Sequence, residues 1–212
     1  MPTLVIFGFG YIGSAVAEKA VALGWKVRVL VRSEAKAAEL REQGIDVVVG
    51  DIADRTWHER LEPKANYVLN AVSASGGDYE RTYVEGNRSL MAWASQGQID
   101  TLVYTSSTGV YPHADGAWLD EASAVKEDDI FVRAENVILA PAVSLSPVRY
   151  FILRLGGVYG PRRHYLLDTL RQGQVEIPGR GDFYINFIHR DDAVRAILAA
   201  FAAPAEIRNQ VY

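Results

Sequence analysis

The stretch TLVIFGFGYIG, residues 3–13, joins a short apolar run to three closely spaced glycines near the start of the chain. The apolar run predicts a buried β-strand, and the residues after the second glycine have the spacing of an amphipathic helix. Gly8 permits a tight turn, Gly10 lets a diphosphate approach the backbone, and Gly13 lets the helix pack closely on the strand. The stretch therefore predicts a strand–turn–helix unit whose helix N-terminus faces an anion.

Strand-like and helix-like segments alternate along most of the chain. Strands are expected at 3–7, 26–31, 46–49, 66–71, 101–105 and 148–155, and helices at 11–23, 34–43, 56–61 and 79–95. Short apolar strands that alternate with helices pair in parallel, with helices on both faces of the sheet. The sequence predicts an α/β fold, a Rossmann-type doubly wound parallel sheet with a small or truncated C-terminal substrate-binding part. We expect residues 1–155 to form the dinucleotide-binding domain and residues 156–212 to be the substrate-binding part, interwoven with the last strand and helix.

Composition narrows the classes of partner. The chain has 212 residues and a net charge of -4, which argues against nucleic acid because a phosphate-binding face normally carries a basic excess. No apolar run approaches the roughly 18 residues that cross a bilayer, and the N-terminus lacks the basic leader of a signal peptide. The absence of cysteine rules out thiolate metal sites and fits a reducing compartment. We expect a cytoplasmic protein that binds no metal, membrane or nucleic acid.

The glycine-rich turn in this context is typical of a nicotinamide dinucleotide site, and the end of the second strand distinguishes NADP from NAD. An NAD site usually carries an acidic residue there, which bonds the ribose 2′-hydroxyl. Here the strand is followed by Arg32 and Ser33, which would pair with a 2′-phosphate and add a hydroxyl. The rival residue, Glu34, is expected in the first turn of the next helix, where a carboxylate suits the helix dipole. The pattern favours NADP. The alternative is that the cofactor is NAD and that Arg32 is only a solvated residue at the end of the strand.

Further cofactor contacts are expected where other strands end at the same edge. Asp51 follows the third strand and would either accept a hydrogen bond from the adenine amine or form a turn. Small residues after the fourth strand would let the backbone pass close to a ribose. The full set of expected cofactor contacts is Gly8, Phe9, Gly10, Tyr11, Ile12, Gly13, Arg32, Ser33, Asp51, Ile52, Ala71, Val72, Ser73, Ser106, Gly156 and Gly157.

Later stretches carry a resemblance to a known family. They are LVYTSSTGVYP at 102–112, WLDE at 118–121, RLGGVYGP at 154–161 and NFIHRDDA at 186–193. With the glycine-rich turn, they resemble the extended short-chain dehydrogenase/reductase superfamily in its NAD-dependent epimerase/dehydratase branch, over nearly the whole chain. The resemblance implies an NAD(P)-dependent oxidoreductase or epimerase that acts on a small carbonyl, alcohol or sugar-nucleotide substrate.

The resemblance also implies that Ser107 holds the reacting oxygen, although its hydroxyl would equally suit capping of the following turn. The family's Tyr-x-x-x-Lys pair is missing, because no tyrosine in the chain has a lysine four residues later. In the helix expected at 126–136, one alignment puts Asp129 and Arg133 at these two places. A second alignment, anchored on Glu135, puts there the pair Glu127 and Phe131, and neither alignment supplies a phenol.

Hydride transfer to a carbonyl needs a proton donor beside the developing alkoxide. Tyr111 is the best alternative phenol, although packing beneath its loop would explain it as well. Arg133 would keep a ribose or phosphate contact. Ser107, Tyr111 and Arg133 are therefore the candidate catalytic residues, and the alternative function is a non-catalytic NADP(H)-binding sensor or scaffold.

The end of the chain raises two further expectations. Family members usually continue past a strand like that at 210–212 into helices that close the substrate pocket, so we expect either a short natural form or a truncated piece. The resemblance also implies a homodimer formed through the helix at 79–95. Tyr79, Tyr83 and Trp93 on that helix are expected in the core or in an interface.

Overall fold

The structure is a computed structural model, and it describes residues 1–74, 77–112, 116–140, 148–173 and 184–212. Within that part, one parallel sheet has the strand order β3-β2-β1-β4-β5-β6-β9. Its strands are β1 (Thr3–Phe7), β2 (Lys26–Val31), β3 (Asp46–Val49), β4 (Lys64–Asn70), β5 (Gln98–Ser107), β6 (Arg149–Leu155) and β9 (Gln210–Val211). The strand order reverses between β1 and β4, and ligands of such sheets bind beyond the carboxyl ends of strands at this point. The predicted Rossmann-type sheet is confirmed.

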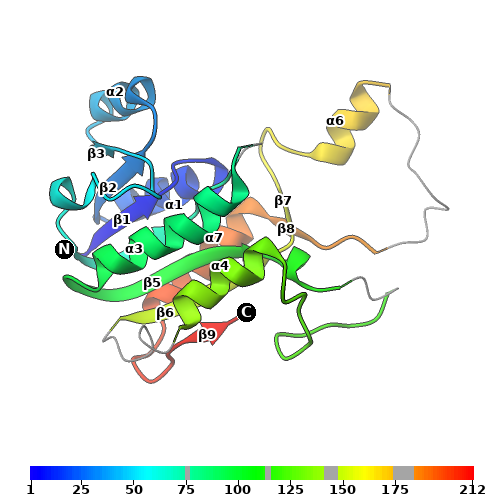
Figure 1. Cartoon of the computed structure of the whole chain (residues 1–212). Coiled ribbons are helices and arrows are strands. Elements are labelled where there is room, and N and C mark those ends of the chain that lie inside the picture. The colour runs from blue at the N-terminus through cyan, green and yellow to red at the C-terminus, as the bar shows by residue number, and fades with distance from the viewer. Residues whose placement is uncertain (75–76, 113–115, 141–147, 174–183) are drawn as a thin grey trace.

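Helices cover both faces of the main sheet (Figure 1). One face carries α1 (Tyr11–Ala22), α2 (Glu34–Glu42) and α7 (Arg190–Ala202). The other face carries the π-helix η2 (Glu80–Glu85), α3 (Gly86–Ala94) and α4 (Ile130–Leu139). Two short 3-10 helices, η1 (His58–Arg60) and η3 (Thr108–Val110), lie in the connections.

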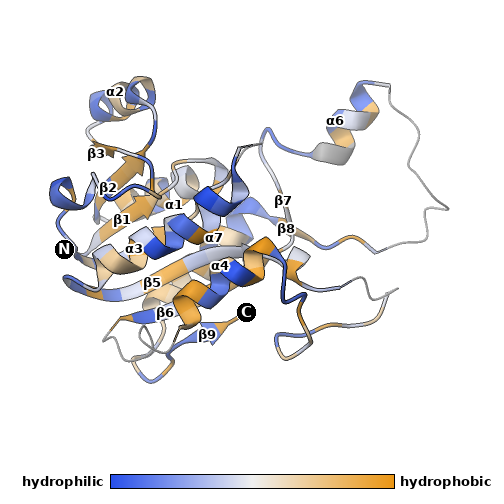
Figure 2. Cartoon of the chain, in the orientation of Figure 1, coloured by the Kyte–Doolittle hydropathy of each residue, from blue (hydrophilic) through white to orange (hydrophobic). Residues whose placement is uncertain are grey.

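Strand β1 is apolar from Leu4 to Phe7, and its packing shows why. Its side chains alternate between faces, so Leu4 and Ile6 join the core beneath α1 while Val5 and Phe7 join the core beneath α3. Phe7 packs edge-on against two tryptophans of that second core, with ring centroids 5.1 and 5.4 Å away. Figure 2 shows the strands as an apolar layer between helices that carry polar residues. Burial on both faces leaves room for a polar residue only at the half-buried first position, Thr3.

A smaller part lies beyond the carboxyl ends of the main strands. There β7 (Gly157–Tyr159) and β8 (Phe187–His189) form a second parallel sheet, and α6 (Tyr165–Arg171) projects away from the body of the molecule (Figure 1). The chain then returns, because α7 packs on the main sheet and β9 pairs with β6. Residues 156–212 thus contribute to both parts. None of the helices described is both long and apolar enough to span a membrane.

Two helices differ from expectation. The helix expected at 126–136 begins only at Ile130, because the Asp129 carboxylate accepts a hydrogen bond from the Phe131 amide at 2.9 Å and caps the helix there. The segment expected as one helix at 79–95 is helical but changes from π to α geometry at Gly86.

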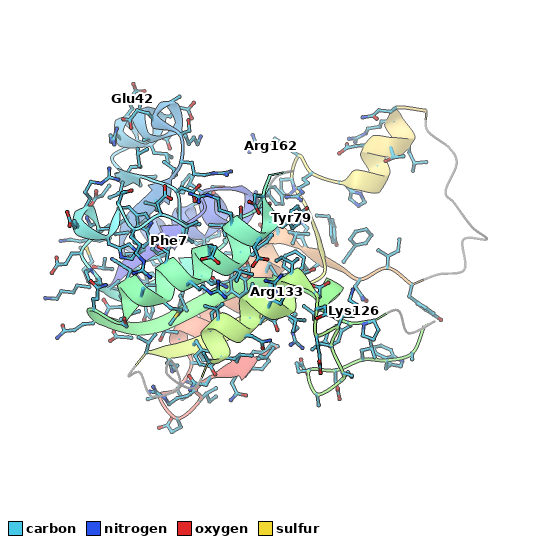
Figure 3. All side chains as sticks on the ribbon, viewed as in Figure 1. Phe7, Glu42, Tyr79, Lys126, Arg133 and Arg162 are labelled. Atoms are coloured by element: carbon cyan, nitrogen blue, oxygen red, sulfur yellow. The ribbon has the colours of Figure 1, made fainter. Side chains whose placement is uncertain are left out.

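Of the three aromatic residues in the helical segment 79–95, two lie in the core and one lies at the surface. Tyr83 and Trp93 are buried, as expected, but Tyr79 is 48% exposed. Tyr79 therefore lies outside the core, and the interface that was the other place expected for it stays a prediction. It precedes the π turn and lies on the carboxyl-edge side of the helix (Figure 3).

Candidate functional site

The glycine-rich turn is held by two very close backbone contacts. Gly8 has φ +92°, and a Cβ there would lie 2.7 Å from the Ala71 oxygen and the Val72 nitrogen. A Cβ on Gly13 would lie 2.0 Å from the Gly8 carbonyl oxygen. Both positions therefore require glycine, because β1, the first turn of α1 and the end of β4 meet there without room for a side chain.

Gly10 is different, because a Cβ added to it would meet no atom of the described protein within 4 Å. Gly10 is also the N-cap of α1, which has no side-chain cap and no acidic residue in its first turn. The open space therefore faces unpaired amides at the positive end of a helix. The open space and the positive end of the helix together form a cradle that suits a negatively charged group such as a diphosphate.

Neighbouring residues of the turn have separate contacts. Phe9 and Ile12 pack against the core beneath α1. The Tyr11 hydroxyl donates a hydrogen bond to the Pro161 oxygen at 3.1 Å. Tyr11 thereby joins the glycine-rich turn to a segment 150 residues further along the chain.

At the end of β2, Arg32 is exposed and forms no hydrogen bond or ion pair with any residue that the structure describes. Ser33 caps α2, since its hydroxyl oxygen accepts a hydrogen bond from the Lys36 amide at 3.3 Å. Glu34 lies in the first turn of α2, as expected, and its carboxylate pairs with Arg41 at 2.6 Å. The edge of the sheet therefore presents a cation, while the rival carboxylate is engaged elsewhere.

After β3, Asp51 shapes a turn and carries an ion pair. One oxygen accepts a hydrogen bond from the Ala53 amide at 2.9 Å, and the other lies 3.4 Å from the Arg81 Nε. The hydrogen bond from Arg81 to Asp54, together with the charge of Asp51, raises the pKa of Arg81. Ile52 is only 5% exposed and packs in the core, so only its backbone can reach a ligand.

Hydrogen bonds with β1 and with the Asn70 side chain hold residues 71 and 72, which directly follow β4. The Ala71 amide donates to the Phe7 oxygen at 2.9 Å, and the buried Asn70 side chain accepts from the Val72 amide and donates to Asn87. Ser73 is exposed at this edge. The backbone of residues 71 and 72 therefore lies directly against Gly8, beside the open cradle at Gly10.

Ser107 and Tyr111 lie at either end of η3. The Ser107 hydroxyl oxygen accepts a hydrogen bond from the Gly109 amide at 3.0 Å, which is the capping contact weighed as its alternative role. The Tyr111 oxygen accepts a hydrogen bond from Arg154 Nη1 at 2.9 Å, and the guanidinium also lies 5.1 Å from the centre of the Tyr111 ring. Within the described part of the chain, neither hydroxyl donates a hydrogen bond to a protein acceptor, so both protons are available there for a ligand.

A buried ion pair, not anticipated from the sequence, supports this part of the site. Arg154 and Glu135 approach to 2.7 Å, and Ser106 donates to the same carboxylate at 2.5 Å. Burial opposes the charge of Arg154, but the hydrogen bonds and charges of Glu135 and Tyr111 outweigh it and raise the pKa of the guanidinium. The available signal was a charged residue inside or next to an apolar run: Arg154 interrupts FILRL at 151–155, and Glu135 lies two residues before VIL at 137–139.

Helix α4 supplies no proton donor at the place of the missing pair. Arg133 is exposed and pairs with Glu80 at 2.6 Å, so its guanidinium bridges α4 to η2 (Figure 3). Phe131 packs against Tyr83, and Asp129 caps the helix. The neighbouring phenol of Tyr104 is buried, and that burial raises its pKa far above the ordinary range.

Gly156 and Gly157 are required by protein contacts. A Cβ on Gly156 would lie 2.8 Å from the Asn186 oxygen, and one on Gly157 would lie 2.7 Å from the Phe187 ring. Their lack of side chains lets β7 approach β8, and a cofactor contact at these glycines stays a prediction.

The site is an open edge. Two hollows of about 810 and 500 Å³ lie at the amino ends of the strands, around Trp25 and around Arg149, on the side opposite the glycine-rich turn. Among the residues described, no three histidine or carboxylate side chains gather as a metal site.

Comparison with known proteins agrees with this geometry. The model of the NAD dependent epimerase/dehydratase family matches residues 4–212. A Synechocystis sp. protein is 31% identical over 121 residues, which are 54% of this chain and 35% of that protein. Protein YeeZ of Escherichia coli is 24% identical over 96% of this chain and 74% of its own length. The decarboxylating sterol-4-alpha-carboxylate 3-dehydrogenase of Saccharomyces cerevisiae is 26% identical over 80% of this chain and 54% of its own length.

Solved structures share the fold. UDP-glucose 4-epimerase of Thermotoga maritima superposes with a TM-score of 0.80 at 20% identity, over 99% of this chain and 75% of that one. The corresponding epimerase of Thermus thermophilus, solved with NAD, has a TM-score of 0.79 at 20% identity, over 99% of this chain and 76% of that one.

Proposed function

Because this chain belongs to the NAD-dependent epimerase/dehydratase family, we propose that it binds NADP(H) along the carboxyl edge of the main sheet. There it catalyses hydride transfer to or from a carbonyl or alcohol group of its substrate. The observation that carries the proposal is the glycine-rich turn, in which Gly8 and Gly13 are closed by backbone contacts while Gly10 stands open before the first amides of α1. Such a turn suits the pyrophosphate of a dinucleotide.

When bound, the dinucleotide supplies or accepts the hydride at its nicotinamide ring. The chain's own residues hold the substrate oxygen and supply its proton. Ser107 donates a hydrogen bond to that oxygen, and Tyr111 gives up its phenolic proton as the oxygen gains charge. Arg154 donates to the Tyr111 oxygen, so its positive charge stabilises the phenolate left after transfer. In the reverse direction, the same phenolate takes the proton from an alcohol.

Arg32 supports NADP(H) as the preferred cofactor. Its guanidinium is free of partners among the described residues, and a guanidinium binds a phosphate through paired hydrogen bonds. Titrations of NADPH and NADH, followed by nicotinamide fluorescence, test the assignment. Arg32→Ala should weaken NADPH binding at least tenfold and leave NADH binding nearly unchanged, whereas Glu34→Ala should alter neither. Tighter binding of NADH than of NADPH by the unaltered protein refutes the preference.

Two exposed aromatic residues beyond the main sheet, Trp118 and Tyr184, favour a substrate with an apolar ring system. Trp118 is 99% exposed and Tyr184 is 86% exposed, and the Tyr184 ring lies close to Gly116 of the segment that carries Trp118. The yeast relative is named for a sterol substrate, which agrees with an apolar body. We expect turnover of bulky aromatic or alicyclic ketones before that of UDP-sugars.

A turnover assay separates the enzyme from the non-catalytic alternative, which the missing Tyr-x-x-x-Lys pair keeps open. Oxidation of NADPH is followed at its absorbance band against panels of ketones and UDP-sugars. The enzyme predicts a signal that Tyr111→Phe lowers at least a hundredfold. NADPH binding without turnover, and without any epimerised product by chromatography, favours the sensor.

A further inference from the structure

A tight turn after β7 places two arginines beside the glycine-rich turn. The Gly160 amide donates to the Arg163 oxygen at 2.9 Å, and the Arg163 amide donates back to the Gly160 oxygen at 3.0 Å. Pro161 and Arg162 form the tip of this turn. Arg162 has φ +61°, a left-handed conformation that favours glycine over a residue with a Cβ.

The turn is attached to Tyr11 by two contacts and by the close approach of Gly160. The Tyr11 hydroxyl donates to the Pro161 oxygen at 3.1 Å, and the Arg163 Cζ lies 5.2 Å from the centre of the Tyr11 ring. A Cβ on Gly160 would lie 2.9 Å from the Tyr11 hydroxyl, so glycine is needed for this approach. Tyr11 directly follows Gly10. The guanidinium of Arg163 therefore contacts the side chain of the residue next to the proposed pyrophosphate cradle.

These two arginines lack the partners that most surface arginines of the chain have. Neither Arg162 nor Arg163 forms an ion pair with any carboxylate in the described part of the chain. By contrast, Arg190, which also faces the Tyr11 ring, is paired with Asp191 at 2.9 Å. Figure 3 shows Arg162 where the chain leaves the body of the molecule toward α6. A turn with two such arginines and a strained backbone at one of them therefore lies against Tyr11, the residue after Gly10, and strain of this kind clusters at functional sites.

We propose that Arg162 and Arg163 form a cationic clamp that closes over the pyrophosphate of the bound dinucleotide, opposite the amides of the glycine-rich turn. The inference rests on the proposed function, since it concerns the same cofactor. The cradle amides carry only partial charge, whereas a pyrophosphate carries two full negative charges. Guanidinium groups supply the missing charge and bind phosphate oxygens in pairs. The clamp thus acts at the centre of the dinucleotide, while Arg32 acts at its adenosine end.

The test compares cofactor affinities of single and paired variants. Arg162→Gly with Arg163→Ala removes both guanidiniums and also relieves the left-handed backbone at residue 162. NADPH fluorescence titration should show binding weakened at least tenfold, whereas the melting temperature without cofactor stays the same or rises. Arg163→Lys should retain part of the affinity. Arg195→Ala, which removes one exposed positive charge from α7, is the matched control and should change NADPH binding less than twofold.

A second probe assigns the contact to the pyrophosphate. ADP-ribose contains the pyrophosphate but no nicotinamide, and calorimetry should show the same proportional loss of its affinity in the paired variant. Unchanged NADPH binding in that variant overturns the clamp. Loss for NADPH with none for ADP-ribose also overturns it, because the arginines would then act on the nicotinamide half. If the unaltered protein binds no dinucleotide at all, the proposed function itself is wrong, which is a separate outcome.

Discussion

Gly10 and Gly13 have different roles, because Gly10 leaves space for a ligand and Gly13 allows close packing. Replacing each of them with alanine should distinguish these roles. A Cβ on Gly13 meets the Gly8 oxygen at 2.0 Å, so Gly13→Ala forces the backbone of α1 away from β1. We expect a loss of about 1–3 kcal/mol or more from this overpacking. For a chain of this size, each kcal/mol corresponds to roughly 2–4 °C in melting temperature.

Gly10→Ala should give the reverse pattern. Its methyl group enters space that is empty in the protein, so the melting temperature should remain within about 1 °C, given that surface changes are usually near neutral. NADPH affinity should fall at least tenfold, because the methyl group occupies the cradle. Thermal melting combined with fluorescence titration reads both effects. A Gly10→Ala protein that binds NADPH normally would contradict the cradle.

The Arg154–Glu135 pair makes a second prediction at the same scale. Glu135 is 1% exposed, so Arg154→Ala leaves a buried carboxylate without its cation. Breaking such a pair costs about 3–5 kcal/mol. Chemical denaturation should show this loss, and the double variant Arg154→Met with Glu135→Gln should recover much of it. Equal losses in both variants would mean that packing, rather than the unpaired charge, sets the stability.

At the scale of elements, the contact between η1 and α3 contains a titratable group. His58 Nε2 lies 3.0 Å from the Ser89 hydroxyl, which itself donates to the Asp54 oxygen. Burial, aided by the charge of Arg55, lowers the pKa of His58 below its ordinary value of 6.5, and the contact with Ser89 only partly opposes this.

This lowered pKa sets the direction of a pH effect. Between the folded-state pKa and about 6.5, the unfolded chain binds more protons, so His58 makes stability rise with pH and fall as pH drops from 7.5 to 5.5. The pKa of Asp191, lowered chiefly by its hydrogen bond with Arg190, changes stability only at lower pH, as its carboxylate becomes protonated. His58→Gln should therefore show a smaller fall in melting temperature between pH 7.5 and 5.5. An identical fall in both proteins would remove His58 as the cause.

Strands were easier to predict than helix boundaries, for reasons visible in single elements. The strand at 3–7 was located to the residue, because burial on both faces leaves an apolar run that stops abruptly at Gly8. The start of α4 was misplaced because Lys126, Glu127 and Asp128 are acceptable helix residues, and only the cap at Asp129 ends the preceding coil. The π turn of η2 leaves no local signature in the sequence, although Gly86, where it ends, lies so close to Ile52 that a Cβ there would be 2.9 Å from the Ile52 side chain.

At the scale of the molecule, one part of the candidate site could be predicted from the sequence and another part could not. The glycine-rich turn was predictable because its function demands particular backbone shapes within six residues. The ion pair of Arg154 with Glu135 and the attachment of Tyr11 to Pro161 join segments far apart in the chain. Such contacts depend on the sheet order, which brings β5, β6 and α4 together. A single sequence shows the residues but not their distances.

The outer surface of η2, α3 and α4 indicates which oligomeric state to expect in solution. The family resemblance implies a dimer through the helix at 79–95, but in the described residues of that helix and of α4 only one large apolar side chain, that of Tyr79, is exposed. Their outer surface carries charges already paired within the chain, such as Arg88 with Glu85 and Arg133 with Glu80. Stable homodimers bury about 1,200–2,000 Å² or more around an apolar centre, which this surface lacks. We therefore expect sedimentation velocity at tens of micromolar to give a single species near the chain mass of 23.4 kDa. A dimer that Arg88→Glu dissociates would contradict this and restore the helix surface as an interface.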